Sequence, residues 1–143
     1  LITDNLSLDT TDIVMRMYAK AEMLAYQRKY IEALSLYDSL INKYQFHSLV
    51  DEALFEKYKI YYKLEDFDNC IFALNKILDY SLNDILGDDA TYFLAKIYDE
   101  KINDINQALL NYNIIIEKFQ GSIYYDFSRK KIKGIQIKQN DNL

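Results

Sequence analysis

The chain has 143 residues, enough for one domain that buries roughly two thirds of the surface of its unfolded form. Half of its residues are hydrophobic and 27% are charged, which is typical of a globular protein and not of a disordered one. Its net charge of −5 argues against a nucleic-acid partner, because a nucleic-acid-binding surface requires concentrated positive charge.

Hydrophobic periodicity predicts about seven helices and no sheet, a pattern that suits a chain with three glycines and no proline. Residues 1–11 are polar and lack a period, so we interpret them as a leader that ends where Thr11 and Asp12 cap the first helix. The predicted helices cover about residues 13–28, 31–44, 50–64, 67–80, 88–100, 105–119 and 124–135. Residues 137–143 are expected to fray.

The helices form pairs that repeat one pattern in a fixed register. A small residue recurs at Ala33, Cys70 and Ala108, with spacings of 37 and then 38 residues, and the extra residue of the third copy falls in its turn, near residues 101–104. Small residues are needed because two antiparallel helices joined by a tight turn approach closely. The positions expected to pack within and between the pairs are Ala21, Ala33, Tyr37, Tyr58, Cys70, Leu74, Ala95, Ala108 and Tyr112.

The first helix of each pair also repeats a motif in register. It reads Met17-x-x-Lys20-Ala21-x-x-Leu24, then Leu54-x-x-Lys57-Tyr58-x-x-Tyr61, then Thr91-x-x-Leu94-Ala95-x-x-Tyr98. This resembles the tetratricopeptide repeat family, whose pattern is Trp-x-x-Leu-Gly-x-x-Tyr followed by Ala-x-x-x-Phe. The resemblance implies an all-α, right-handed α-solenoid over residues 12–136, with repeats at about 13–45, 50–81 and 87–120 and a C-terminal capping helix at 123–136.

The segment Phe119–Lys131 looks like the end of bacterial envelope repeat proteins, namely the outer-membrane assembly lipoproteins, the Tol-Pal-associated periplasmic proteins and Bacteroidetes-type repeat proteins. This similarity implies a location in the cell envelope or periplasm, with the cytoplasm as the alternative. Because the chain begins at Leu1, we expect an excised or mature segment. The basic cluster Arg129–Lys131 with Lys133 is interpreted as a last helical turn, where cations complement the helix dipole.

No constellation of residues predicts catalysis. A single histidine, His47, and a single cysteine, Cys70, cannot build a zinc site, and no phosphate-binding glycine loop is present, so we expect no enzyme, metal or cofactor. His47 is interpreted as a solvated loop residue and Cys70 as a buried packing residue. The acidic pairs Asp51–Glu52, Asp88–Asp89 and Asp99–Glu100 are explained by solvation and, at helix starts, by the dipole.

The family resemblance implies a binding groove lined by the first helix of each pair. The residue that follows the tryptophan-type position would point into the concave groove. The groove residues would be Tyr18, Phe55 and Tyr92, then Glu22, Lys59 and Lys96, then Ala25, Tyr62 and Asp99. Aromatic rings on a polar-rimmed concave surface are good anchors for a peptide or a partner helix. The alternative is that these rings pack between successive helices.

We therefore expect a non-catalytic protein-interaction or scaffold module that binds a protein or peptide. Two alternatives stay open: a structural block that self-associates into a homo-oligomer, and a regulatory segment of a larger enzyme or sensor. No run approaches the ~18 apolar residues of a membrane span, so we expect no direct membrane insertion.

Overall fold

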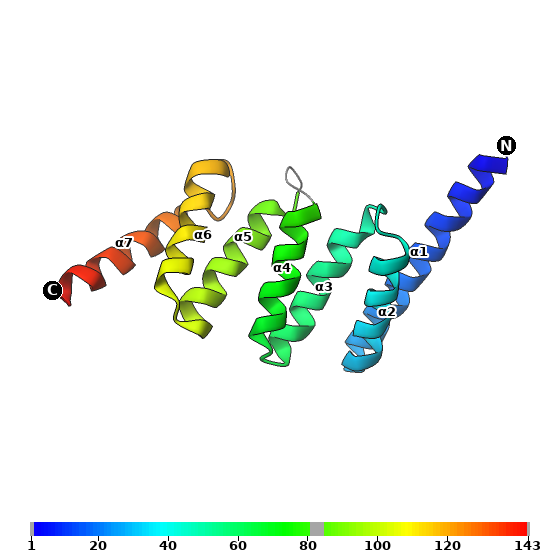
Figure 1. Cartoon of the computed structure of the whole chain (residues 1–143), viewed down its shortest axis with the longest axis horizontal. Helices are drawn as coiled ribbons and strands as arrows, with labels where there is room; N and C mark the ends of the chain where they lie inside the picture. The colour runs from blue at the N-terminus through cyan, green and yellow to red at the C-terminus, as the bar shows by residue number, and fades with distance from the viewer. Residues whose placement is uncertain (1, 81–84, 143) are drawn as a thin grey trace. The chain divides into compact units, whose positions relative to one another are not determined.

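The computed structural model describes residues 2–80 and 85–142, with the side chains of residues 9–80 and 85–142, and in this part of the chain helices are joined by short turns (Figure 1). Seven α-helices and one π-helical turn account for it, and it contains no strand. The chain divides into two compact units, Leu1–Ala73 and Leu74–Leu143, which are described separately. The loop expected at residues 81–84 lies outside the described residues.

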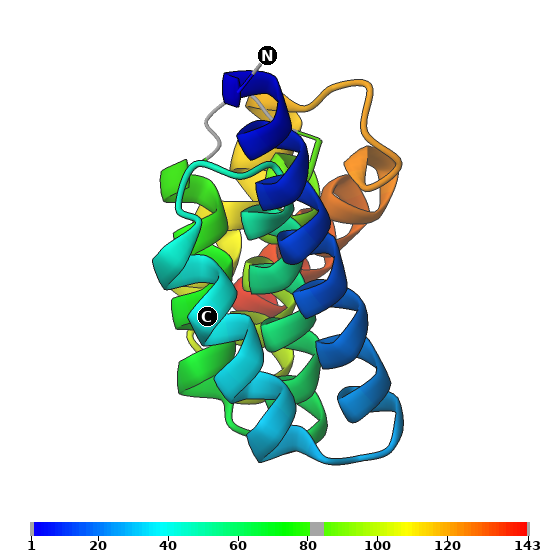
Figure 2. The same cartoon turned by 90° about the vertical axis from the view of Figure 1, so that its right-hand side faces the viewer.

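The first unit contains α1 (Ile2–Tyr26), α2 (Tyr30–Lys43), α3 (Leu49–Lys63) and the beginning of α4 (Phe67–Tyr80). Helices α2 and α3 both pack against α1 and against each other, and Figure 2 shows α1 and α2 side by side. Their interior is a stripe of fully buried side chains at helical spacing, as an amphipathic helix requires. It includes Val14, Ala21, Ala33, Tyr37, Leu40 and Ala53, each 0% exposed.

The helix start predicted near residue 13 is wrong, because α1 already begins at Ile2, within the segment 1–11 that was interpreted as a leader. No glycine or proline lies before Gly87, so nothing in the sequence stops the helix from extending toward the N-terminus. Adding a residue to an existing helix costs far less than starting one. Thr11 and Asp12 therefore lie inside α1 and do not cap it.

The second unit contains α5 (Gly87–Ile97), the π-helical turn η1 (Tyr98–Ile102), α6 (Ile105–Lys118) and α7 (Tyr125–Asp141), together with the end of α4. Helix α6 packs against both α5 and α7. The β-branched run that ends α6 is helical, as its register predicts. The core of this unit consists of Tyr92, Ala95, Ala108, Tyr112, Ile115 and Ile135.

Helix α7 continues to Asp141, six residues beyond the end predicted for it at residue 135, so residues 137–141 form helix and not a frayed tail. The basic cluster at residues 129–133 was interpreted as the last turn of this helix, but it lies in the second and third turns of α7. Lys138 is the basic residue of the last turn. Because the helix dipole acts only within the terminal turns, it does not explain the cluster.

The three turns within the helix pairs share one backbone conformation. Arg28, Glu65 and Asn103 have positive φ angles of 63°, 56° and 63°, and they recur at the spacing of the repeat. After Arg28 and Glu65 the chain closes in the same way, because the amide of the next residue donates to the carbonyl five residues earlier: Lys29 to Leu24 and Asp66 to Tyr61. This is the Schellman end of a helix, in which a left-handed residue terminates the last turn.

The third turn contains the extra residue of the third copy. The π-helical turn η1 absorbs it, so that the Asp104 amide donates to the Tyr98 carbonyl, six residues earlier instead of five. The second helix then starts in the same register as before: the amides of Ala33, Cys70 and Ala108 each donate to the residue four positions back. All nine positions expected to pack are buried, with Tyr58 the most exposed at 7%.

Candidate functional site

The first unit has a hollow of about 330 Å³ between α1 and α3. Its lining consists of Glu22, Ala25 and Tyr26 from α1, and Glu56, Lys59, Ile60 and Lys63 from α3. Three of these, Glu22, Ala25 and Lys59, are positions that the family resemblance assigned to the groove. The structure therefore brings part of the expected groove face together within one unit.

The α3 wall of this hollow is organised by Lys59. Its ammonium group pairs with Glu56 at 2.5 Å and lies 5.4 Å from the centre of the Phe55 ring. Both contacts hold the ammonium group near the aromatic face. Phe55 is half-buried, and its ring also contacts Tyr58 at a centroid distance of 5.4 Å. The ring of Tyr62, 40% exposed, contacts Tyr58 and Phe67 instead of lining the hollow.

Tyr18 lies on α1 one turn before Glu22, half-buried, and its ring meets the ring of Tyr37 edge to face at 5.8 Å. Burial, followed by the charge of the Glu56 carboxylate, raises the pKa of both hydroxyls. The Tyr37 hydroxyl is fully buried and has no hydrogen-bond partner among the described residues. A buried hydroxyl without a hydrogen-bond partner costs free energy of folding. Within the described residues the Tyr37 hydroxyl is such a group, and the charge of Glu56 acts on it.

A second hollow, of about 460 Å³, lies on another side of α1, between α1 and α2. Its lining mixes Lys20 and Leu24 with Ile31, Glu32, Ser35, Leu36 and Ser39. It contains no aromatic side chain and none of the expected groove residues. It therefore serves as a comparison site for the hollow between α1 and α3.

In the second unit, the expected groove residue Tyr92 is a core residue. It is 8% exposed, and the ring of Tyr124 stacks on it with a centroid distance of 4.3 Å and an interplanar angle of 12°. The Tyr124 hydroxyl donates to Asp89 at 2.6 Å, and the Ser122 hydroxyl donates to Asp88 at 2.6 Å. For Tyr92 the packing alternative holds, because the segment that leads into α7 covers its ring.

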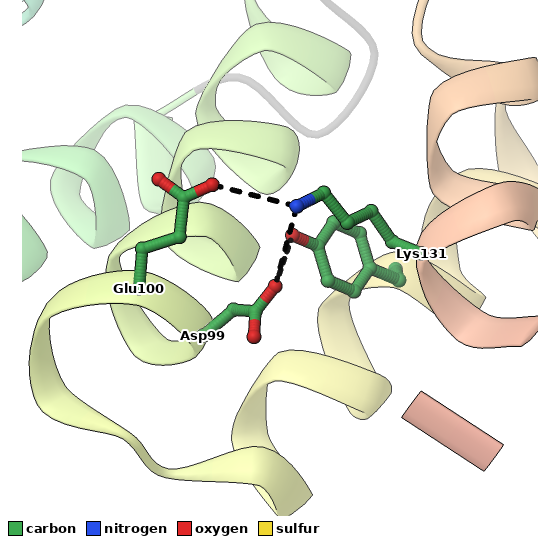
Figure 3. A network of polar contacts seen from close by, with 4 residues as sticks. Asp99, Glu100 and Lys131 are labelled. Atoms are coloured by element: carbon green, nitrogen blue, oxygen red, sulfur yellow. Dashed lines mark hydrogen bonds and ion pairs between the residues drawn. The ribbon is translucent and has the colours of Figure 1, made fainter. Parts of the chain in front are cut away.

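Asp99 was also expected in the groove, but it binds its own chain. It accepts a hydrogen bond from the Tyr112 hydroxyl at 3.1 Å, and Figure 3 shows Lys131 of α7 reaching both Asp99, at 4.0 Å, and Glu100, at 3.5 Å. Burial and then the charge of Asp99 raise the pKa of Tyr112, so the hydroxyl remains a donor. Lys96 is half-buried and makes no ion pair within the described part of the chain.

No family model and no curated protein matches the chain. Across residues 2–80 and 85–142, no helix is both long and apolar enough to cross a membrane. In the same residues, no group of three or more His, Cys, Asp or Glu side chains is placed to hold a metal ion. The function is therefore argued from the geometry of the two units.

Cys70 and His47 are both engaged inside the fold. The Cys70 thiol is fully buried and donates to the Tyr58 carbonyl at 3.6 Å, and burial raises its pKa to about 12, so it stays protonated and unreactive. His47 is half-buried and its Nδ1 accepts a hydrogen bond from the Leu49 amide at 3.1 Å. His47 therefore lies in the loop, as expected, but it is only partly solvated, because its ring supports the turn into α3.

The polar contacts around Asp88 and Asp89 were missed by the sequence reasoning, which explained this pair by the helix dipole. Both carboxylates do lie in the first turn of α5, but they also fasten Ser122 and Tyr124. The feature of the sequence that could have revealed these contacts is the equivalence of two loops, 75 residues apart, that lead into α3 and α7. The Leu49 amide bonds to His47, and 75 residues later the Tyr124 amide bonds to the Ser122 hydroxyl in the same way, at 3.1 Å.

Proposed function

We propose that the chain is a tetratricopeptide-like helical repeat array and acts as a non-catalytic protein-interaction module. The shared left-handed turns at Arg28, Glu65 and Asn103 support a repeated structural unit. The equivalent hydrogen bonds that start α2, α4 and α6 support the same register. In this proposal three helix pairs form a right-handed solenoid, and α7 caps it, as a terminal helix with one polar face should.

The hollow between α1 and α3 is the observation that carries the binding function. Ile60 and Ala25 supply an apolar floor, while Glu22 and Lys63 bring opposite charges that form no ion pair within the described residues. A volume of about 330 Å³ lies at the small end of ligand pockets, so it suits one or two side chains of a peptide or helix. The partner is therefore a protein or peptide that places an apolar residue between charged ones.

The similarity of residues 119–131 to envelope repeat proteins supports a partner in the bacterial cell envelope or periplasm. It also supports a scaffold role, in which the module holds a partner in place without altering it. The site needs no metal or cofactor to bind a helix by burial and charge pairing.

The test is a selection of short displayed peptides against the whole chain, followed by affinity measurements on variants. Ala25→Trp fills the hollow, and Glu22→Lys with Lys63→Glu inverts its charges without changing buried side chains. Peptides selected on the native chain should bind both variants at least about tenfold more weakly, a loss of roughly 1.4 kcal/mol.

Ser35→Trp, in the hollow between α1 and α2, is the matched control and should leave the affinity unchanged. Circular dichroism shows whether each variant keeps its helices. A selected peptide that binds the two groove variants as tightly as the native chain would contradict the site. A selection that enriches no peptide would contradict the function.

A further inference from the structure

The outward face of α7 carries a row of exposed residues, of which Phe127 keeps one contact with its own unit, a tilted ring contact with Tyr92 at a centroid distance of 6.5 Å. Phe127, Lys130, Gly134 and Ile137 follow one another at spacings of three or four residues, so they lie on one helical face. All are exposed; the Phe127 side chain is 57% exposed and that of Ile137 is 52% exposed. The opposite face, with Ser128 and Ile135, is the buried one.

The charges on this face also lack a role within the described residues. Helix α7 contains five Lys or Arg residues and two Asp, in a chain whose net charge is −5. Lys131 pairs with Asp99 and Glu100, but Lys130, Lys133 and Lys138 form no ion pair in the part of the chain that the structure describes. The helix dipole does not explain Lys130 and Lys133, which lie in the second and third turns, so these two cations are available to an acidic surface.

Gly134 adds a steric feature to the same face. A glycine inside a helix costs about 1 kcal/mol relative to alanine, so it usually has a packing reason. Here a Cβ atom at residue 134 would meet nothing within 4 Å, so this unit supplies no such reason. A glycine at the centre of an exposed face allows another backbone to approach closely.

The N-terminal half of α1 is complementary to the outward face of α7, because its described side chains are exposed and it is acidic and partly apolar. Every residue from Asp9 to Ile13 is exposed, and Val14 is the first buried residue among the described side chains. Helices in water are stabilised mainly by packing of one face, so a helical segment exposed on all sides needs a partner surface. Helix α1 has 25 residues and α2 has 14, so α2 covers only part of its length.

This segment of α1 is acidic and carries apolar groups. Residues 2–13 contain three aspartates and no lysine or arginine. Asp9 is exposed, and among the described side chains Asp12 pairs with Arg16 in an exposed contact, which contributes little. Ile13 is 47% exposed and Met15 is 56% exposed, so the acidic stretch ends in apolar surface.

We propose that the outward face of α7 in one molecule binds the acidic N-terminal half of α1 in a second copy of the chain. Lys130 and Lys133 would meet Asp9 and Asp12, while Phe127 and Ile137 would cover Ile13 and Met15. The two surfaces are different, so the contact is heterologous and assembly proceeds head to tail, either as a ring or as an open chain of molecules.

Charge reversal tests both surfaces, measured by sedimentation equilibrium on the whole chain over a range of protein concentrations. Lys130→Glu with Lys133→Glu inverts the α7 face, and Asp9→Lys with Asp12→Lys inverts the α1 face. Each double variant alone should stay monomeric where the native chain associates. An equimolar mixture should associate again, because each inverted face then meets a face of opposite charge.

The native association should also weaken at least about tenfold when the salt concentration rises well above 0.1 M, because exposed charges are then screened. Lys29→Glu with Lys118→Glu changes the net charge equally on exposed sites outside both faces and should associate like the native chain. A native chain that is monomeric at every concentration overturns the proposal. So does association that survives either charge reversal, or a mixture that fails to restore it.

Discussion

The ring of Tyr124 lies flat against the ring of Tyr92, with centroids 4.3 Å apart, while its hydroxyl donates to Asp89. One side chain thus makes both an apolar and a charge-assisted contact with α5, just before α7 begins. Because α7 contributes only a narrow buried stripe, with Ser128 and Ile135, this contact fixes the direction in which the helix leaves its turn.

Shortening Tyr124 should destabilise the chain in two separable steps. Tyr124→Phe keeps the stacked ring but loses the hydrogen bond to a carboxylate, at a cost of about 1–2 kcal/mol in the free energy of unfolding. Tyr124→Ala also loses the ring contact, for a total cost of about 2–4 kcal/mol. Urea denaturation followed by circular dichroism measures both values.

The control is Tyr26→Ala, at a side chain that is 88% exposed, which should change the free energy of unfolding by less than about 0.5 kcal/mol. Equal costs for Tyr124→Phe and Tyr124→Ala would mean that the stack contributes nothing.

The stability of the chain should fall at alkaline pH. Burial raises the pKa of the hydroxyls of Tyr37 and Tyr112, so these groups stay protonated in the folded chain above pH 10, where unfolded tyrosines ionise. The folded state then binds more protons than the unfolded state, and each such group lowers the free energy of unfolding by up to about 1.4 kcal/mol per pH unit.

The measurement is the free energy of unfolding between about pH 8 and 11, compared with that of Tyr112→Phe. The variant removes one of the buried hydroxyls, so its stability should fall less steeply above pH 10 than that of the native chain. Lysines lose their charge in the same range, but they are equal in both proteins. Identical slopes would contradict a role for the Tyr112 hydroxyl.

Glycine should be favoured where the helix-pair turns are left-handed. Glu65 has a φ of 56°, a conformation that costs a non-glycine residue about 1–2 kcal/mol, and its side chain is exposed. Glu65→Gly should therefore raise the free energy of unfolding by about 0.5–1 kcal/mol after the greater flexibility of unfolded glycine is included. Asn103→Gly should gain less, because asparagine tolerates this conformation. A larger gain at Asn103 than at Glu65 would contradict this explanation.

The two helical glycines should respond differently to alanine. At Gly134 a Cβ atom meets nothing within 4 Å, so Gly134→Ala should stabilise the chain by up to about 1 kcal/mol. At Gly87 the Cβ atom would lie 3.3 Å from Cζ of Phe119, so the same substitution must displace that ring and should gain less or cost stability. Thermal unfolding of both variants at low protein concentration measures the difference. A larger gain at Gly87 would contradict the packing seen at Phe119.

Periodicity was sufficient to predict the helices from α2 to α6 because each has a continuous buried stripe that the sequence displays. The same reasoning failed at both ends. Residues 2–11 lack such a stripe, yet they are helical because no residue there breaks α1. The helix prediction for α7 stopped at residue 135, where its apolar pattern ends, although its backbone continues to Asp141.

The groove prediction was limited by a different physical factor. A register assigns equivalent positions, but the neighbours of each position decide its exposure. Tyr18 and Phe55 are half-buried in the first unit, whereas Tyr92, at the equivalent position, is covered by Tyr124. Asp99 likewise binds Tyr112 and Lys131 because the π-helical turn adds a residue just there. Sequence periodicity contains no information on which segment covers the last member of a repeated set.

That added residue has a consequence for lengthening the protein by design. The turns at Arg28 and Glu65 are interchangeable, because both close over five residues, but the turn at Asn103 closes over six and brings Asp99 and Glu100 to Lys131. For the repeat array that we propose, duplicated 37-residue copies should therefore be inserted upstream of Tyr98. The 38-residue copy should stay last, because its irregular turn supplies the two carboxylates that pair with Lys131 of the terminal helix.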